Sequence, residues 1–261
     1  MARSASVWDP TQYLRFANER LRPALDLLAQ VPLDAPARVV DLGCGAGNVT
    51  AILQQRFPRA EVVGVDGSAA MLEKARVTVP LCRFEQADFF QWRPTEPLDL
   101  IYSNAALQWV DRHPTLFPQL LSFLAPGGVL AVQMPAMHDT PLRLIPYDLA
   151  AKQPWEQYLS DVSSAPAILS PAEYWDLLRP RVASLDLWQT TYMHALSGEN
   201  AVAEWAAGSS LRPFLDRLPD ERKEAFRRAY TDAARPHYPR GADGTTLLPF
   251  QRLFMVARSA C

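Results

Sequence analysis

The sequence predicts an α/β fold built on a mostly parallel sheet, and three observations lead to this fold class. Strand-like and helix-like segments alternate between residues 38 and 134, which is the pattern of βαβ units. A glycine-rich turn over residues 43–47 follows the first strand-like segment, where the chain must bend into a helix. With 261 residues, 49% of them hydrophobic, the chain can bury a sizeable core within one elaborated domain.

Each element follows from its local pattern of apolar residues. The N-terminal stretch 11–30 has helical spacing, but Pro23 lacks an amide donor and favours two short helices over one. Seven strands are expected, over residues 38–41, 61–66, 82–87, 98–103, 128–134, 185–196 and 245–258. Helices are expected over residues 48–57, 68–78, 113–124, in parts of 139–180, and in a block over 199–238 that is broken at Pro213 and Pro219.

Composition narrows the classes of function. With 26 basic and 28 acidic residues and no basic tract, the chain lacks the charge that binding to a nucleic-acid backbone requires. It shows no signal-type N-terminus and no apolar run of membrane-spanning length, so we expect a cytoplasmic protein without a membrane partner. Three widely spaced cysteines and no Cys/His cluster predict free thiols, no disulfide and no metal.

The glycine turn predicts a ligand site of the nucleotide type. Asp41 ends the first strand, and Gly43, Gly45 and Gly47 follow at alternate positions, where the missing Cβ atoms allow the backbone to approach a ligand closely. The dinucleotide fingerprint G-x-G-x-x-G would need glycine at the position of Asn48. This departure weakens the hypothesis of a nicotinamide-dependent oxidoreductase.

Polar residues follow the next three strands as well. Asp66, 19 residues after Gly47, could accept both hydroxyls of a ribose. Asp88 could accept an adenine amino group while Phe89 packs on the ring, and Asn104 follows the fourth strand. The carboxyl ends of parallel strands meet at one edge of the sheet, where such folds bind ligands. Each residue alone could instead be a helix cap or a turn former.

The spacing D-x-G-x-G-x-G resembles the first motif of class I methyltransferases, and from Val7 onward the chain resembles the trans-aconitate 2-methyltransferase family. The segments that carry this second resemblance are Trp8-Asp-Pro10, Tyr13-Leu-x-Phe16, Glu19-Arg20-x-Arg22-Pro23-Ala24, Leu107-Gln-Trp109, Val129 to Pro135, Trp188-x-Thr-Thr-Tyr192-x-His194, Leu211-Arg-Pro213 and Arg252 to Arg258. Departures include Ala46, Ser209-Ser210 and the stretch from His138 to Ser170.

The resemblance implies a Rossmann-like class I methyltransferase fold with a seven-stranded sheet, helices on both faces and a helical cap near the C-terminus. It implies one domain, 1–261, with a helical lid (1–30), a cofactor-binding core (37–134), a helical segment (135–180) and a cap insertion (197–244) between the last two strands. The cofactor would be S-adenosylmethionine, converted to S-adenosylhomocysteine. The expected cofactor-binding residues are Tyr13, Asp41, Gly43, Cys44, Gly45, Gly47, Asn48, Asp66, Gly67, Ser68, Met71, Asp88, Phe89, Asn104 and Trp109.

The reaction implied is methyl esterification of trans-aconitate or a related small polycarboxylate. A carboxylate is already ionised at neutral pH, so we expect no catalytic base, only alignment and exclusion of water. Guanidinium groups and polar side chains should bind such a substrate. The candidates are Arg20, Arg22, Tyr192, His194, Arg212 and Arg252. For each arginine the alternative is a surface ion pair or a packed stem, and for the other two a buried structural pair.

Other functions stay open at this level. The acceptor could be a hydroxyl or an amine of another small metabolite, which a general base beside the site would favour. The chain could also be a binding module that has kept the fold and lost turnover, and an oxidoreductase is a more remote alternative. We expect a small-molecule substrate and a monomer or a weak dimer.

Overall fold

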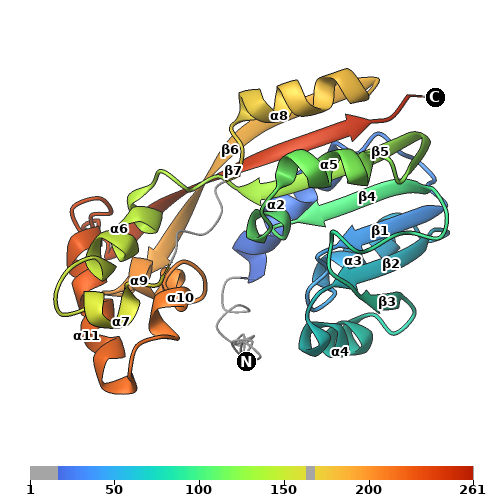
Figure 1. Cartoon of the computed structure of the whole chain (residues 1–261). Helices are drawn as coiled ribbons and strands as arrows, with labels where there is room; N and C mark the ends of the chain where they lie inside the picture. Colours follow the sequence, from blue (N-terminus) through green and yellow to red (C-terminus); the bar gives the residue numbers. More distant parts are fainter. Residues whose placement is uncertain (1–16, 163–167, 261) are drawn as a thin grey trace. The chain divides into compact units, whose positions relative to one another are not determined.

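A computed structural model describes residues 17–162 and 168–260, with side chains from Leu21 onward. Seven strands form one sheet in the order β3-β2-β1-β4-β5-β7-β6 (Figure 1). Strands β1 to β5 pair in parallel, and β7 runs antiparallel to β5. Their bounds are β1 (Arg38–Leu42), β2 (Glu61–Asp66), β3 (Arg83–Gln86), β4 (Leu98–Asn104), β5 (Leu124–Pro135), β6 (Ser184–Ser197) and β7 (Thr245–Arg258). The predicted fold class is therefore confirmed.

Helices connect the parallel strands and fill the chain between β5 and β7. Those before β5 are α2 (Ala17–Ala29), α3 (Asn48–Arg56), α4 (Ala69–Thr78), the 3₁₀ turn η1 (Leu107–Trp109) and α5 (His113–Leu121). Those after it are α6 (Pro141–Ala150), α7 (Glu156–Leu159), α8 (Pro171–Leu178), η2 (Arg179–Arg181), α9 (Ala201–Ala207), α10 (Arg212–Leu215) and α11 (Asp220–Ala234). None of the helices in the described ranges combines the length and the apolar character that crossing a bilayer requires.

Contacts between residues divide the chain into two compact units. The sheet unit holds residues 20–136, 168–190 and 252–260, and the helical unit holds residues 137–162 and 191–251. Strands β6 and β7 each contribute residues to both units. The insertion 197–244 that the sequence predicts between the last two strands does hold helices α9, α10 and α11, while its role as a cap and that of residues 1–30 as a lid stay predictions.

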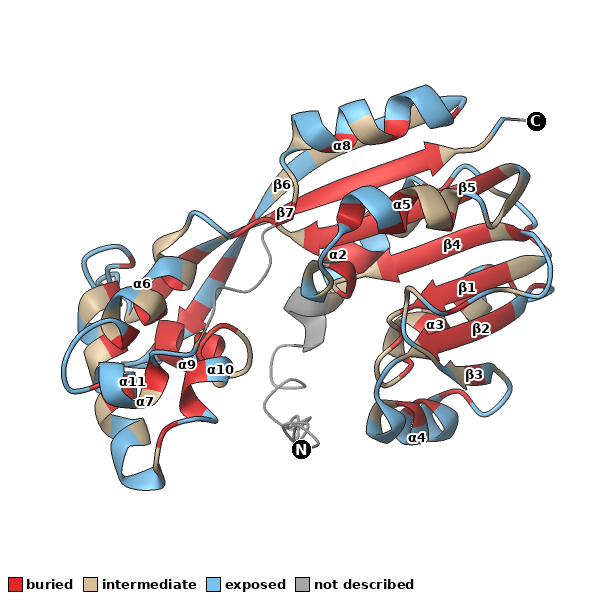
Figure 2. Ribbon diagram, viewed as in Figure 1, coloured by how far each residue is buried: buried red, intermediate tan, exposed pale blue. Residues whose placement is uncertain are grey.

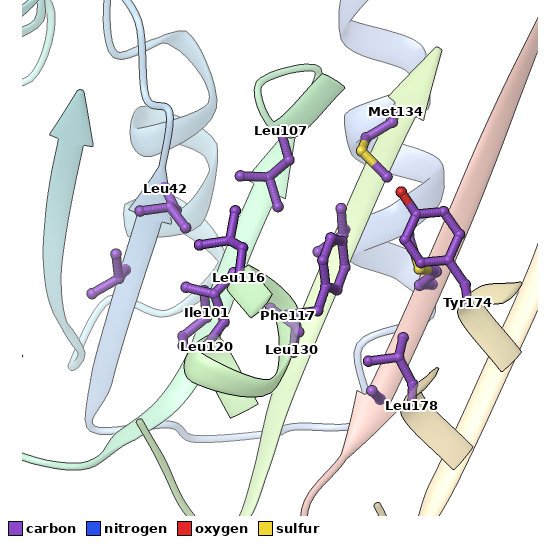
Figure 3. Packing of buried hydrophobic residues seen from close by; sticks show 14 of the residues in the cluster. Leu42, Ile101, Leu107, Leu116, Phe117, Leu120, Leu130, Met134, Tyr174 and Leu178 are labelled. Carbon is purple, nitrogen blue, oxygen red and sulfur yellow. The ribbon is translucent and has the colours of Figure 1, made fainter. Parts of the chain in front are cut away.

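Apolar side chains cover both faces of the sheet in the sheet unit. On one face, Phe117 of α5 and Tyr174 of α8 pack with strand residues such as Ile101 and Leu130 (Figure 3). On the other face, α3 contacts β1 and β2, and α4 contacts β2 and β3. The strands between these layers are largely buried (Figure 2). Since burial of apolar surface is the main favourable term in folding, these layers fix the strand ends that carry the site.

The prediction of two short helices around Pro23 is wrong, because α2 runs through this residue without a break. Pro23 removes one amide donor from the helix. Two contacts outweigh this loss: Ala24 and Leu27 are 2% and 0% exposed, and the hydroxyl of Tyr102 donates to the carbonyl of Ala24. The helix is therefore held by tertiary packing, which local sequence does not report.

The boundary between α5 and β5 also differs from the prediction. Helix α5 ends at Leu121 rather than at residue 124, and β5 begins at Leu124 rather than at residue 128. Leu124 pairs with Leu98 of β4, with a register shift before Leu100. Pairing with β4 therefore extends the strand through the Pro-Gly-Gly stretch that suggested a turn. The breaks predicted in the late helices are confirmed, because Pro213 lies in the first turn of α10 and Pro219 precedes α11.

The helical unit has an apolar core of its own. Phe214 and Phe226 stack with ring centroids 5.9 Å apart, and Trp155 meets Phe226 edge-on at 5.2 Å. The Tyr230 hydroxyl donates to the carbonyl of Leu142 over 3.2 Å. These contacts join α6, α7, α10 and α11 into one packed body.

Candidate active site

The glycine turn after β1 has three residues in the left-handed region, and they differ in their surroundings. Gly43, Gly45 and Gly47 have φ angles of 83°, 54° and 85°. A Cβ atom at Gly43 would lie 2.1 Å from the Cβ of Ala106, and one at Gly47 would lie 3.2 Å from Ala75. A Cβ at Gly45 would meet none of the described atoms within 4 Å. Gly45 is thus the glycine whose backbone faces open space, where a ligand can approach it.

Asp66, at the end of β2, holds this turn in place. One carboxylate oxygen accepts the Gly45 amide over 2.9 Å, and the other accepts the Ser68 amide over 2.8 Å. Ser68 is the N-cap of α4, and its hydroxyl accepts the Met71 amide over 3.4 Å. Each carboxylate oxygen has a second lone pair, so Asp66 can still accept hydroxyls from a ligand while it orders the loop.

Asp41, at the end of β1, is a buried acid without a counter-ion among the described residues. Its side chain is 1% exposed, and the Thr50 hydroxyl donates to it over 2.6 Å. Burial raises the pKa of the Asp41 carboxyl to about 7. The hydrogen bond from Thr50 lowers this pKa, whereas the nearby negative charge of Asp66 raises it further. A carboxylate held in this state would be stabilised by a cationic group such as an ammonium.

Cys44 packs its thiol into an apolar cluster, and its backbone helps to close the glycine turn. The side chain is 6% exposed and packs with Leu72, Ala75 and Phe84. Burial raises the pKa of this thiol well above its usual range, so it stays protonated and unreactive. Its amide donates to Val65 of β2 over 3.1 Å, which closes the loop against the neighbouring strand. The contact between Cys44 and a cofactor that the sequence predicts would therefore use the backbone of this residue.

Other polar residues that the sequence selected also lie at the carboxyl ends of β3 and β4. Asp88 is exposed and its carboxylate accepts the Phe90 amide over 2.8 Å, so it forms a turn and leaves lone pairs toward solvent. Phe89 lies near Gly43, since its ring would be 3.4 Å from a Cβ there. Asn104 ends β4, and its side-chain oxygen is buried with no partner among the described residues.

The remaining positions of the predicted set lie on the same loop or cannot be described. Gly67 precedes the cap of α4, and Asn48 is the first residue of α3. Trp109 of η1 is 57% exposed, which leaves its ring free to meet a ligand. Tyr13 lies outside the described residues.

Sequence reasoning missed Gln133, a fully buried amide in β5. Its side-chain oxygen accepts Arg252 Nη1 over 3.3 Å, while its Nε2 has no partner among the described residues. Gln133 is the register neighbour of Asn104, and Arg252 is that of Pro135, so these polar side chains share one face of the sheet. A single amide within the apolar run from Val129 to Met134 is the signal that could have shown it.

Among the candidate substrate arginines, the two in the sheet unit with described side chains have different surroundings. Arg22 is mainly solvent-exposed, with Nε 3.8 Å from a carboxylate oxygen of Asp26 in a surface pair, and its substrate role stays a prediction. Arg252 is 4% exposed. A guanidinium buried this far must have partners, and Gln133 is one of them. The side chain of Arg20 lies outside the described residues.

In the helical unit, Tyr192 and His194 are buried on one face of β6, as their alternation predicts. The His194 ring lies 4.6 Å from that of Trp205 and 5.7 Å from that of Phe250. Arg212 begins α10, with Nε 3.4 Å from a carboxylate oxygen of Asp216. All three therefore belong to this unit's packed interior or its border.

The strand ends of the sheet unit fit S-adenosylmethionine, a ligand with a cationic amino-acid end and a nucleoside end. Asp41 supplies a buried negative charge, Gly45 an open backbone, and Asp66 a carboxylate for hydroxyls. These features lie on consecutive strand ends of one unit. The same arrangement offers no phosphate-binding glycine at Asn48, where a dinucleotide fingerprint would place one.

Comparison with known families agrees with this class of site. The chain matches the methyltransferase domain family over residues 13–195. Fold and site together thus define a class I methyltransferase that uses S-adenosylmethionine as its methyl donor.

Curated relatives are similar over almost their whole length. The trans-aconitate 2-methyltransferase of Methylobacterium radiotolerans is 48% identical over 256 residues, covering 97% of this chain and 98% of the relative. That of Paracidovorax citrulli is 47% identical over 254 residues, covering 96% and 98%. The chain belongs to the trans-aconitate 2-methyltransferase family.

Solved structures support the fold at lower similarity. A Haemonchus contortus phosphoethanolamine N-methyltransferase 2, in complex with phosphomonomethylethanolamine and S-adenosylhomocysteine, superposes with a TM-score of 0.56 at 16% identity. That match covers 92% of this chain and 53% of the other. The YcgJ protein of Bacillus subtilis gives a TM-score of 0.59 at 15% identity, covering 92% and 99%. Both likenesses concern the fold alone.

Proposed function

We propose that this chain methylates a carboxylate of trans-aconitate, giving a monomethyl ester. The observation that carries the proposal is the 48% identity, over 97% of the chain, to a relative named trans-aconitate 2-methyltransferase. The matched region covers residues of both the sheet unit and the helical unit, rather than the cofactor loop alone. The acceptor assignment therefore rests on the whole chain.

We propose that the strand ends of the sheet unit bind the methyl donor. Asp41 would pair with the donor's ammonium, because it is a buried carboxylate without a described counter-ion. Asp66 would accept the ribose hydroxyls, and Asp88 with Phe89 would meet the adenine. The other proposed donor contacts are Tyr13, Gly43, Cys44, Gly45, Gly47, Asn48, Gly67, Ser68, Met71, Asn104 and Trp109.

When bound, S-adenosylmethionine supplies an electrophilic methyl group. The acceptor carboxylate is ionised at neutral pH and needs no base from the protein. The protein's own part is to orient the carboxylate, to keep water out, and to bind the acid groups that do not react. Because charge is neutralised as the ester forms, a site of low polarity favours the reaction.

The acceptor's carboxylates need donors, and buried guanidinium groups supply the strongest ones. Arg252 is buried and is oriented by Gln133, which supports a substrate role in the sheet unit. Arg20 and Arg22 stay predictions, the latter weakened by its exposure. Tyr192, His194 and Arg212 are the proposed substrate residues of the helical unit. Cytoplasmic localisation, the absence of nucleic-acid partners and a monomeric or weakly dimeric state also stay predictions.

The test is transfer of a radiolabelled methyl group to a panel of small di- and tricarboxylates that includes trans-aconitate. Label on trans-aconitate that mild base releases would establish an ester. The Asp41→Asn variant should lose the label, and Asp34→Asn, which changes an exposed carboxylate, should keep it. Absence of label on every acid, while the donor still binds, would overturn the acceptor and leave the class of enzyme standing.

A further inference from the structure

The turn between α9 and α10 presents two polar side chains on either side of a buried anchor. The amides of Ser209 and Leu211 both donate to the carbonyl of Ala206, over 2.9 Å and 3.0 Å. Leu211 is 0% exposed and fixes the turn in the core of the helical unit. Ser210 and Arg212 flank it in the sequence, so the same anchor holds both side chains.

Both side chains keep a buried polar atom without a described partner. Ser210 is 8% exposed, and its Oγ has no hydrogen-bond partner among the described residues. The Nη2 of Arg212 is likewise buried without a partner in that part of the chain. Among the described residues this guanidinium forms an ion pair through Nε, which lies 3.4 Å from a carboxylate oxygen of Asp216, whose own side chain is 44% exposed. Leaving such groups unsatisfied costs stability, so a fold that keeps two of them within three residues needs a reason.

The hydrogen-bonding chemistry of Arg212 and Ser210 favours an anion as their ligand. A guanidinium only donates hydrogen bonds, and a serine hydroxyl can donate one. The interior around the turn is apolar, with Phe214 and Leu215 of α10 buried beside it. A planar carboxylate matches the fork of a guanidinium, and in apolar surroundings the bond between them is stronger than in water.

We propose that Arg212 and Ser210 bind a carboxylate of the acceptor that does not receive the methyl group. This inference rests on the proposed function, because it assumes a polycarboxylic acceptor. Arg212 binds through its free Nη2 edge while Asp216 keeps Nε oriented. Ser210 donates a second hydrogen bond to the same carboxylate. The turn thus sets how many acid groups an acceptor must carry.

The test removes the Arg212 guanidinium from the protein and, separately, one carboxylate from the acceptor. The wild type and the Arg212→Met variant are assayed for kcat/KM on trans-aconitate and on two analogues, each with one carboxylate replaced by a neutral amide. On trans-aconitate, Arg212→Met should lose about 30-fold or more, as expected for a hydrogen bond to a charged group together with its ion pair. On the one analogue that lacks the bound carboxylate, the same substitution should change kcat/KM less than about threefold. Ser210→Ala should repeat this pattern with a smaller loss.

Arg228→Met serves as the matched control, because it removes an exposed arginine of α11 from the same unit. It should leave every kcat/KM unchanged. Equal losses on trans-aconitate and on every reactive analogue would assign Arg212 a purely structural role and overturn the inference. So would a wild-type rate in Arg212→Met on trans-aconitate. If the wild type itself leaves trans-aconitate unmethylated, the proposed function fails instead, and the two failures are distinguishable.

Discussion

The donor loop of the sheet unit and the α9–α10 turn of the helical unit satisfy their polar groups in opposite ways. Around Gly45, the side chain of Asp66 accepts backbone amides on both of its oxygens, so the loop is complete without a ligand. At the turn, Ser210 and Arg212 keep donors that the described chain does not satisfy. The difference teaches that the donor loop is ordered before a ligand arrives, whereas the turn keeps side-chain donors without a partner among the described residues.

The largest effect is expected for Asp41→Asn, which removes the one buried charge of the donor site. Binding of S-adenosylmethionine should weaken by about 100-fold or more, as for a buried ion pair that loses one partner. Titration calorimetry measures the affinity. Asp34→Asn is the matched control on the surface. Unchanged affinity in Asp41→Asn would mean that the Asp41 carboxylate does not contact the donor's ammonium.

Two glycines of the donor loop allow a second comparison, between a position packed against the protein and a position that faces open space. Gly43→Ala places a Cβ 2.1 Å from that of Ala106, so it should lower the free energy of unfolding by about 3 kcal/mol. Gly45→Ala meets open space and should cost only about 1 kcal/mol of backbone strain, yet weaken donor binding about tenfold. Denaturant titration and calorimetry on both variants check this. Equal losses in the free energy of unfolding would contradict the expected difference between Gly43 and Gly45.

The pH dependence should sharpen the role of Asp41. Its folded pKa of about 7 lies above the ordinary value of 3.8, so the ligand-free fold binds the extra proton more readily than the unfolded chain does. This carboxyl therefore destabilises the ligand-free protein most above pH 7, and the penalty disappears as the pH falls toward 4. Donor affinity should change in the opposite direction, falling about tenfold per pH unit below 7. Asp41→Asn should flatten the pH dependence of both the free energy of unfolding and the donor affinity. If the variant kept the wild-type pH dependence, the titrating group would be a residue other than Asp41.

The smallest effect concerns Gln133, whose Nε2, like Oδ1 of Asn104, is buried without a partner among the described residues. Gln133→Leu should lower kcat/KM for the acceptor about five- to tenfold, since Arg252 loses the amide that orients it. Donor affinity should stay within twofold. Steady-state kinetics and calorimetry check the two expectations. The exposed Gln55→Leu is the control, and a loss of donor affinity in Gln133→Leu would place this amide in the donor site instead.

Much of the sheet could be predicted from sequence because its signals are local. The span of β2 and that of β7 agree with the predicted ranges at both ends, since alternation and apolar runs are properties of a few adjacent residues. The glycine turn was recognisable for the same reason. Helix α2 was not, because the contacts that keep it intact at Pro23 come from β4, far along the chain.

The candidate site divides in the same way. Asp41 and Asp66 could be selected because each ends a strand next to the turn, a position visible in the sequence. Gln133 and Ser210 could not, because what marks them is a buried atom without a described partner, and burial of one atom is a property of the packed fold. Cys44 was selected for its place in the loop, where its thiol packs with Leu72 and Ala75, so its backbone stays the proposed donor contact.

The double anchor of Asp66 has a thermodynamic consequence for binding. Because Gly45 and the start of α4 are already tied to one carboxylate, the loop needs no ordering when S-adenosylmethionine arrives, and the entropy cost of association is confined to the ligand and a few side chains. The heat-capacity change of donor binding should therefore reflect only the apolar area the ligand itself covers, without the larger negative value that accompanies folding of a loop.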